Sequence, residues 1–146
     1  MGEDSVAPFL EFANKWVIVL GLTSNKGSQD FQFLQNQASE KFFYHEVLEK
    51  TQAWGSVDNL MYVIGATHPE KFEHIRQIVP NHFLLVPGVG AQGGDLDGLV
   101  KYGKNDEIGL LVNSSRGIIF ADEGTHFAEA AAEAAGTLSK RMATYF

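Results

Sequence analysis

The sequence predicts an α/β fold in which parallel strands alternate with helices. Four short apolar runs are spaced along the 146 residues, and helical patterns lie between and after them. Each run opens into a loop that contains Gly or Ser. Strands that alternate with helices form parallel sheets, and such strands are continuous apolar runs because both faces of the sheet are covered.

The first half of the chain contains a leading helix and two of the predicted strands. Pro8 fits the leading helix only within its first turn, because a proline further along removes a hydrogen bond. The β-branched run at residues 16–20 is typical of a buried strand. The predicted elements are a helix at 6–13, a strand at 16–20, a loop at 23–30, a helix at 41–54 and a strand at 60–64.

The second half continues the alternation with capping signals. Thr67 or His68 is expected to cap a helix that has Pro69 in an early position and ends at Pro80. Asp95 is expected to cap a short helix after a glycine-rich loop, and Thr125 to cap the last helix. The predicted elements are a strand at 83–86, a helix at 96–102, a strand at 109–112 and a helix at 125–144.

The length and the element count together suggest half of a barrel. Four strand–loop–helix units in 146 residues give about 36 residues per unit, compared with roughly 31 in an eight-unit barrel of about 250 residues. A doubly wound open sheet is the alternative, but it normally has a fifth strand, and none is found. We expect residues 1–146 to form one domain.

Composition excludes several classes of function. With 45% hydrophobic and 20% charged residues the chain can build a core, and its net charge of −7 argues against nucleic acid as a partner. The absence of cysteine excludes disulfides and thiolate chemistry. Five scattered histidines give no metal-ligand spacing, so no metal and no cofactor is expected.

The sequence contains neither a predicted membrane-spanning stretch nor a predicted signal peptide. No apolar stretch approaches the roughly 20 residues that a membrane span needs, and the acidic start at residues 1–4 does not resemble a signal peptide. We therefore expect no membrane partner and a cytoplasmic location. Because Met1 and Gly2 stand directly before a helical pattern, we expect the chain to be a fragment of a longer protein.

A glycine-rich loop follows the third predicted strand. The sequence from Leu84 to Asp95 reads Leu-Leu-Val-Pro-Gly-Val-Gly-Ala-Gln-Gly-Gly-Asp. Glycines permit positive φ and let a ligand approach the backbone, whose N–H groups can then surround an anion such as phosphate. Alone, the loop is equally compatible with a tight strand-to-helix turn.

A second polar loop follows the fourth predicted strand and contains an arginine. It reads Asn113-Ser114-Ser115-Arg116-Gly117. An isolated arginine is more often part of a surface ion pair, but Arg116 comes directly after a strand. Because parallel strands carry their ligands at their carboxyl ends, the two loops together predict one phosphate held between them.

These motifs resemble the phosphate-binding end of orotidine 5′-phosphate decarboxylase, most closely its longer bacterial subfamily. Residues 87–93 and 114–117 carry the resemblance, together with Thr23-Ser24-Asn25-Lys26-Gly27 after the first strand and Gly65-Ala66-Thr67 after the second. Each motif alone is weak, but the four occur in register at successive strand ends. The resemblance implies a (β/α)8 TIM barrel of which this chain is the C-terminal half, strands five to eight.

The resemblance also implies roles for individual residues. Arg116 should clamp the nucleotide phosphate, because a guanidinium can bond two phosphate oxygens at once. Ser24 should contact the pyrimidine edge, although it could instead cap a turn. The remaining implied contacts are the amide of Gln92 and the backbone around Gly93 and Gly117 to the phosphate, and Pro87 and Val89 as apolar wall beside the ring.

The catalytic residues that the resemblance implies are absent. The family uses an Asp-x-Lys-x-x-Asp pattern and a further lysine from the first half of the barrel, and none of the seven aspartates here is followed by lysine two positions later. We therefore assign no catalytic residue and expect this chain alone to lack activity. The parent reaction would convert orotidine 5′-phosphate to uridine 5′-phosphate and CO2 in pyrimidine biosynthesis.

Two alternatives remain beside the decarboxylase. The chain could be a nucleotide- or phosphate-binding half-barrel without chemistry, or part of another phosphate-binding (β/α)8 enzyme such as a sugar-phosphate epimerase or synthase. The motif at residues 23–27 disfavours the latter, because those enzymes have no pyrimidine to bind. A half-barrel also leaves two strand edges open, so we expect a homodimer or self-association through the open surfaces.

Overall fold

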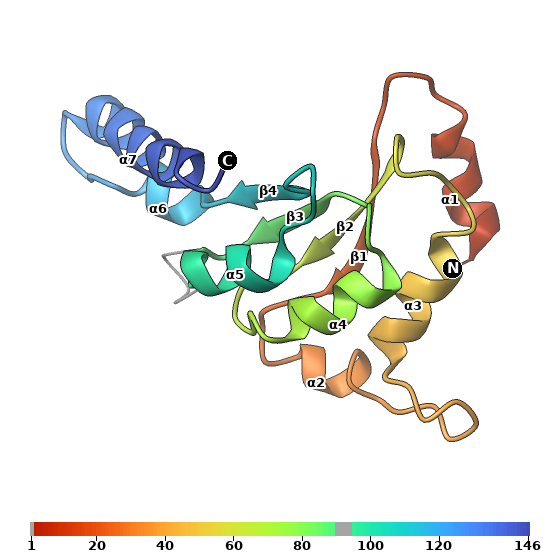
Figure 1. Ribbon diagram of the computed structural model, residues 1–146. Coiled ribbons are helices and arrows are strands. Elements are labelled where there is room, and N and C mark those ends of the chain that lie inside the picture. Colours follow the sequence, from red (N-terminus) through yellow and green to blue (C-terminus); the bar gives the residue numbers. More distant parts are fainter. Residues whose placement is uncertain (1, 90–94) are drawn as a thin grey trace.

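The computed structural model describes residues 2–89 and 95–146. In these ranges four parallel strands form one sheet in the order of the chain (Figure 1). The strands are β1 (Val17–Leu22), β2 (Leu60–Ile64), β3 (Leu84–Pro87) and β4 (Leu110–Asn113). The predicted α/β fold with parallel strands alternating with helices is confirmed. A doubly wound sheet reverses its strand order at a switch point, and these four strands do not.

Helices cover one face of the sheet. Figure 1 shows α3, α4 and α5 next to one another across that face, whereas α6 and α7 lie beyond β4. The helices are α1 (Glu3–Leu10), α2 (Ser28–Phe31), α3 (Phe43–Thr51), α4 (Lys71–Ile78), α5 (Leu96–Gly103), α6 (Ser115–Ile119) and α7 (Phe127–Ala143). No helix of the described residues is both long enough and apolar enough to span a bilayer.

The hydrophobic core lies between the sheet and these three helices. Alternate side chains of β2 and β3 point toward the helices and are fully buried, as are the inward positions of α3, α4 and α5. Gly21 lets α3 approach β1, because a Cβ there would lie 3.1 Å from the side chain of Leu48. The core includes Leu48, Leu60, Tyr62, Ile64, Phe72, Ile75, Leu84, Val86, Leu96 and Leu99.

Several predicted element boundaries are wrong. The first helix begins at Glu3, so Pro8 lies in its interior rather than in its first turn. Neither Thr67 nor His68 caps α4, which begins at Lys71 after a turn in which the amide of Phe72 donates to the carbonyl of Pro69. Thr125 does not cap α7 either, because His126 occupies the N-cap position without a side-chain bond.

Other predictions of the elements are confirmed. The second strand has the predicted bounds, 60–64, and Asp95 caps α5 by accepting a hydrogen bond from the amide of Asp97 at 3.0 Å. The short helices α2 and α6 lie in segments that the sequence assigned to loops. Neither segment has a helical pattern, because no hydrophobic periodicity can develop over four or five residues.

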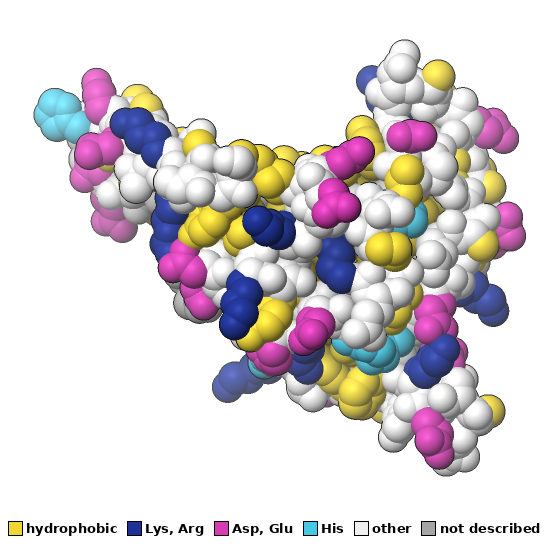
Figure 2. Space-filling model, viewed as in Figure 1, with side chains coloured by type: hydrophobic (Ala, Val, Ile, Leu, Met, Phe, Trp, Pro, Cys, Tyr) yellow, Lys and Arg dark blue, Asp and Glu magenta, His cyan; other side chains and the backbone are white. Residues whose placement is uncertain are grey.

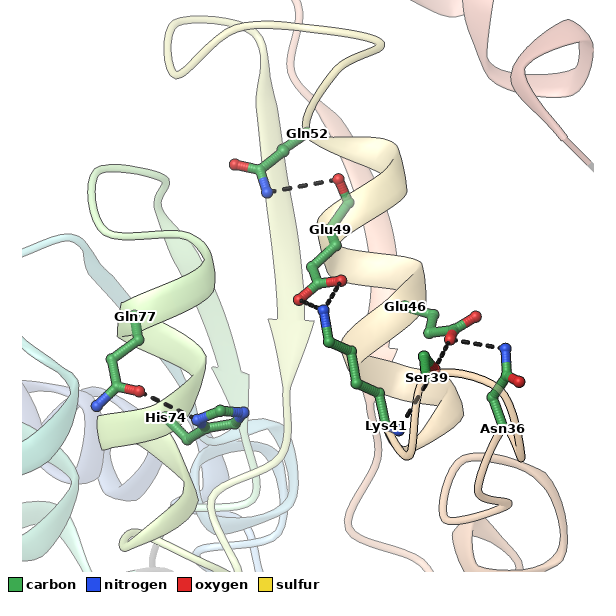
Figure 3. A network of polar contacts seen from close by, with 8 residues as sticks. All are labelled: Asn36, Ser39, Lys41, Glu46, Glu49, Gln52, His74 and Gln77. Atoms are coloured by element: carbon green, nitrogen blue, oxygen red, sulfur yellow. Dashed lines mark hydrogen bonds and ion pairs between the residues drawn. The ribbon is translucent and has the colours of Figure 1, made fainter.

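The segment before α3 is fixed to that helix by charged side chains (Figure 3). Lys41 forms an ion pair with Glu49 at 2.7 Å. Asn36 donates to Glu46 at 2.8 Å, and Ser39 donates to the same carboxylate. These contacts hold the long connection from α2 against the outer surface of α3. Exposed pairs of this kind contribute little to stability, so their effect is mainly on the path of the chain.

Arg76 joins four segments at the amino end of the sheet. Its Nε donates to the carbonyl of Gly103 at 2.6 Å, and its two Nη atoms donate to the carbonyls of His82 at 2.7 Å and Gly109 at 2.8 Å. Longer bonds reach the carbonyls of Val79 and Pro80. Burial without a carboxylate among these partners lowers the pKa of Arg76 to about 10.

Replacing Arg76 should therefore destabilise the fold strongly. Arg76→Ala removes the donors of several partly buried carbonyls, so we expect a loss of about 2–4 kcal/mol in the free energy of unfolding. Urea denaturation at neutral pH measures it. Lys140→Ala, at an exposed position of α7, is the matched control and should change stability by less than about 0.5 kcal/mol. Equal effects of the two substitutions would contradict this role of Arg76.

A buried histidine lies between α3 and α4. The ring centroid of His45 is 4.0 Å from that of Tyr44 and 4.3 Å from that of His74. Its Nε2 is buried and has no hydrogen-bond partner among residues 2–89 and 95–146. Burial, reinforced by the neighbouring His74, lowers the pKa of His45 to about 4. The ring is consequently neutral in the folded protein at neutral pH.

Stability should consequently fall as the pH is lowered from 7 to 5. The unfolded chain takes up a proton at His45 near its ordinary pKa of about 6.5, whereas the folded chain does not. The free energy of unfolding should drop by up to about 2 kcal/mol over this interval, measured by urea denaturation. His45→Phe should reduce the slope, leaving the contribution of His82, whose pKa burial also lowers. Replacement of the exposed His126 by Gln is the control. If His45→Phe and the unsubstituted chain had the same slope of stability against pH, His45 would not be the source of this pH dependence.

Candidate functional site

The parallel arrangement brings all four strand ends to one edge of the sheet. Backbone hydrogen bonds connect the loops after β2 and β3 to the ends of neighbouring strands at this edge. Gly65 donates to the carbonyl of Leu22 at 2.8 Å, Ala66 to that of Pro87 at 3.1 Å, and Gly88 to that of Asn113 at 3.3 Å. The loops that the sequence singled out therefore form a continuous rim rather than four separate turns.

A small pocket lies where β3 and β4 end. Its volume is about 60 Å³, which exceeds the roughly 10–15 Å³ that one water needs and is far below the roughly 300 Å³ of a pocket for a whole drug-sized ligand. A group the size of a small anion suits it better than an entire nucleotide. The pocket is lined by Pro87, Gly88, Val89, Asn113, Ser114, Ser115 and Arg116.

Ser114 fastens the two loops of this pocket together. Its hydroxyl donates to the carbonyl of Val89 at 3.1 Å, across from one strand end to the other. Gly88 has a φ of 94°, a left-handed conformation that favours glycine, and this turns the chain away from β3. Ser115 donates to the side chain of Asn113 at 2.9 Å, which fixes the start of α6. The pocket walls are therefore held by specific bonds.

Arg116 contributes a positive charge to this pocket. It lies in the first turn of α6, is exposed, and has neither an ion pair nor a side-chain hydrogen bond with any residue in 2–89 or 95–146. The buried Arg76, by contrast, has all of its nitrogens bonded to carbonyls. A guanidinium that lines a pocket and has not been neutralised by a neighbouring carboxylate can bind an anion there.

The other predicted site residues are distributed as follows. Pro87, Val89 and Arg116 line the same pocket. Gly117 lines an adjoining cavity of about 190 Å³ between α5, α6 and α7, which Val89 and Ser114 also border. Gln92 and Gly93 lie outside the described residues, so their predicted contacts to the phosphate stay predictions.

Ser24 lies on the same rim but not in this pocket. It follows β1, three strands away from Arg116 in the sheet order. Its hydroxyl is buried and has no hydrogen-bond partner among the described residues. A Cβ added to Gly65 would lie only 2.7 Å from the backbone nitrogen of Ser24 and in contact with its hydroxyl. Gly65 therefore makes room for Ser24, so the loops after β1 and β2 pack directly against each other.

Two residues that line the pocket have no role in the sequence-based prediction. Asn113 and Ser114 belong to the polar motif after the fourth strand, but of that motif only Arg116 and Gly117 are predicted site residues. A usable signal was present: a hydroxyl directly after a strand lies within reach of the neighbouring strand's loop in a parallel sheet. Among the described residues, no three His, Asp or Glu side chains gather closely enough to bind a metal ion.

The fold and this rim define an α/β protein of parallel strands whose polar pocket lies at the carboxyl ends of the last two strands. Comparison with known proteins specifies the class further. The chain belongs to the orotidine 5′-phosphate decarboxylase / HUMPS family, whose family model matches residues 1–131.

Individual relatives agree with this membership. Orotidine 5′-phosphate decarboxylase of Bacteroides fragilis is 57% identical over 98% of this chain, and that of Flavobacterium johnsoniae is also 57% identical over 98%. In both cases the match covers 52% of the relative. The chain therefore spans about half the length of the curated relatives that it matches.

Solved structures give the same result for the fold. The Leishmania donovani OMP decarboxylase superimposes with a TM-score of 0.79 and 32% identity, covering 99% of this chain and 54% of that one. The L. donovani UMP synthase superimposes with a TM-score of 0.82 and 36% identity, covering 99% and 31%. The alternation of parallel strands and helices is thus shared with proteins of this family.

The contact between Gly65 and Ser24 can be tested by adding one methyl group. Gly65→Ala should force the loop after β1 to move, and we expect a loss of about 1–3 kcal/mol in the free energy of unfolding, measured by urea denaturation. Gly136→Ala is the matched control, because nothing lies within 4 Å of its added Cβ in helix α7. That substitution should stabilise by up to about 1 kcal/mol. If Gly65→Ala left the free energy of unfolding unchanged, the close approach of Gly65 and Ser24 would not constrain the rim.

Proposed function

We propose that the chain is the C-terminal half, strands five to eight, of a (β/α)8 orotidine 5′-phosphate decarboxylase. It forms one domain that carries the phosphate-binding end of the active site. The observation that supports this most directly is the pocket at the ends of β3 and β4, which Arg116 lines together with the glycine loop. In (β/α)8 enzymes the phosphate commonly binds at the loops after strands seven and eight.

The proposed ligand is the phosphate of orotidine 5′-phosphate or uridine 5′-phosphate. Arg116 supplies two donors to the phosphate oxygens, and the backbone of Gly117 adds to them. Gln92 and Gly93 complete the phosphate site from the glycine loop in this proposal. Pro87 and Val89 form the apolar wall near the ring. A dianion in so small a pocket leaves the remainder of the nucleotide along the rim.

Ser24 is the proposed contact to the pyrimidine. Its buried hydroxyl lacks a partner among the described residues, and an unpartnered buried hydroxyl costs free energy unless a ligand or water bonds it. Its place on the rim, three strands away from the phosphate pocket in the sheet order, supports a ligand whose two ends are held separately. The Ser24 hydroxyl and backbone then bind the polar edge of the base.

The parent enzyme converts orotidine 5′-phosphate to uridine 5′-phosphate and CO2 in the proposed function. This chain provides binding groups for that reaction. The lysine that protonates the carbanion-like C6 and the carboxylates around it belong to the Asp-x-Lys-x-x-Asp pattern, which the sequence lacks. We infer that the chain alone binds nucleotide without decarboxylating it. A cytoplasmic location and a role without metal or cofactor accompany this proposal.

The proposed phosphate contact is tested by removing the guanidinium. Arg116→Ala should weaken the binding of uridine 5′-phosphate about 10- to 100-fold, as expected for a lost charged hydrogen-bond partner. Isothermal titration of the 146-residue chain, with inorganic phosphate as a second probe, measures it. Lys15→Ala is the matched control, because it removes the same charge from an exposed position just before the amino end of β1.

Each part of the proposal has its own contradicting result. Unchanged affinity in Arg116→Ala would remove this residue from the site. Equal weakening in both variants would indicate a general effect of charge rather than a phosphate contact. Release of CO2 from orotidine 5′-phosphate by the purified chain would refute the inferred inactivity and leave the binding assignment intact.

A further inference from the structure

The side chain of Gln32 reaches back from the end of α2 to the end of β1. Its Oε1 accepts two hydrogen bonds from Thr23, one from the backbone amide at 2.9 Å and one from the hydroxyl at 3.2 Å. A backbone amide can only donate, so the oxygen of the Gln32 side chain rather than its nitrogen must face Thr23. These two bonds close residues 23–32 into a compact loop that contains Ser24.

Gln32 is anchored through its own backbone as well. Its amide donates to the carbonyl of Ser28 at 2.8 Å at the end of α2, and its carbonyl accepts a bond from the amide of Tyr44 at 3.1 Å. Tyr44 lies in the first turn of α3, is 3% exposed and belongs to the hydrophobic core. Gln32 therefore binds Thr23 from a position that is fixed to a core helix.

The end of β1 needs such a contact because its pairing with β2 is irregular. The register between the two strands shifts between Leu20 and Leu22. An irregularity of this kind redirects the residues that follow it and is common beside binding sites. Among residues 2–89 and 95–146, neither Thr23 nor Ser24 forms a backbone-to-backbone hydrogen bond. Gln32 consequently supplies the bonds that the sheet does not.

Thr23, which Gln32 fixes, directly precedes Ser24. One bond to its backbone and one to its side chain leave Thr23 little freedom to rotate, and the direction of the chain at Ser24 depends on it. The backbone of Ser24 also approaches Gly65, where an added Cβ would lie 2.7 Å from the Ser24 nitrogen. The hydroxyl of Ser24 is buried and has no hydrogen-bond partner in the part of the chain that the structure describes. Ser24 is thus held by two contacts while its hydroxyl stays available to a ligand.

The charge of the chain as a whole does not attract a nucleotide. The formal net charge is −7, and Figure 2 shows basic and acidic side chains interspersed on the face in view. A negatively charged ligand is therefore not concentrated by a broad positive surface on this face. Recognition depends on individual short-range contacts, and a hydrogen bond to the base requires a hydroxyl in the right orientation.

We propose that Gln32 is the positioning residue for Ser24 and thereby sets the preference of the site for a pyrimidine nucleotide over a sugar phosphate without a base. The inference rests on the proposed function, in which the Ser24 hydroxyl binds the polar edge of the base. Gln32 does not touch the ligand but acts through Thr23. A hydroxyl that is already oriented binds the base without a further cost of ordering. The phosphate pocket at the ends of β3 and β4 has its own bonds and does not depend on Gln32.

Removal of the acceptor tests this role. In Gln32→Leu the affinity for uridine 5′-phosphate should fall about 3- to 10-fold, as expected for a lost neutral hydrogen bond. The affinity for ribose 5-phosphate should stay unchanged, because that ligand lacks the base. Isothermal titration of the 146-residue chain measures both affinities. Gln29→Leu is the matched control, because it makes the same substitution at an exposed position of α2 and should change neither affinity.

A conservative variant and a double substitution separate positioning from general damage to the fold. Gln32→Glu keeps an oxygen acceptor for Thr23, so its affinity for uridine 5′-phosphate should lie within about twofold of that of the unsubstituted chain. Ser24→Ala should itself weaken this binding. The addition of Gln32→Leu to Ser24→Ala should weaken it little further, because both substitutions act on the same contact. The Thr23 amide should exchange hydrogen at least about tenfold faster in Gln32→Leu than in Gln29→Leu, because it loses its acceptor.

The outcomes distinguish this inference from the function on which it rests. If Ser24→Ala weakens the binding of uridine 5′-phosphate and Gln32→Leu does not, the positioning role is overturned and the proposed function is unaffected. If the unsubstituted chain does not bind this nucleotide, or if Ser24→Ala has no effect, the proposed contact to the base is overturned and the inference with it.

Two further results overturn the positioning role alone. One is equal weakening of uridine 5′-phosphate and ribose 5-phosphate binding in Gln32→Leu, and the other is full additivity of Gln32→Leu with Ser24→Ala. Circular dichroism establishes that each variant is folded. If Gln32→Leu does not fold, Thr23→Val removes one of the two bonds instead, and an unchanged affinity for uridine 5′-phosphate in that variant overturns the inference.

Discussion

Parallel pairing of the strands in chain order is the constraint on which the rest of the structure depends. It sends every strand toward the same edge, so four loops that are far apart in sequence become neighbours. The backbone bonds from Gly65, Ala66 and Gly88 to the adjoining strand ends follow from that pairing. A one-residue slip would also turn the buried side chains of β2 and β3 away from the helices. The position of the site and the composition of the core therefore both depend on the same register between the strands.

The elements themselves could largely be found from the sequence because their hydrophobic patterns are strong. The run at residues 60–64 is apolar throughout, and it is a strand with those bounds. Boundaries were less accurate where tertiary contacts decide them. The chain passes through a turn at Pro69 before α4 begins, and the hydroxyl of Thr125 makes no capping bond. Local capping signals cannot show whether neighbouring segments leave room for the cap geometry.

The candidate site was only partly predictable for a related reason. Pro87, Val89 and Arg116 gather in one pocket because the glycine loop and the arginine follow adjacent strands, an arrangement that a sequence with alternating elements reveals. The bond from Ser114 to Val89 and the contact between Ser24 and Gly65 depend on interstrand register. The position of Ser114 directly after a strand indicates that it lies near the neighbouring loop, but the sequence does not show which residue of that loop it bonds.

The bonds of Arg76 separate the stabilising contacts at the amino ends of the strands from the pocket at their carboxyl ends. Its side chain bonds carbonyls of α5, of the residue before β4 and of the segment before β3, at the amino ends of the strands and opposite the rim that carries the pocket. These hydrogen bonds hold the amino ends of the strands together without any contribution from the loops at the carboxyl ends. Loop positions other than Gly65 and Ser114, which make close contacts between the loops, can consequently vary at little cost to folding, and this gives the architecture freedom to vary its specificity.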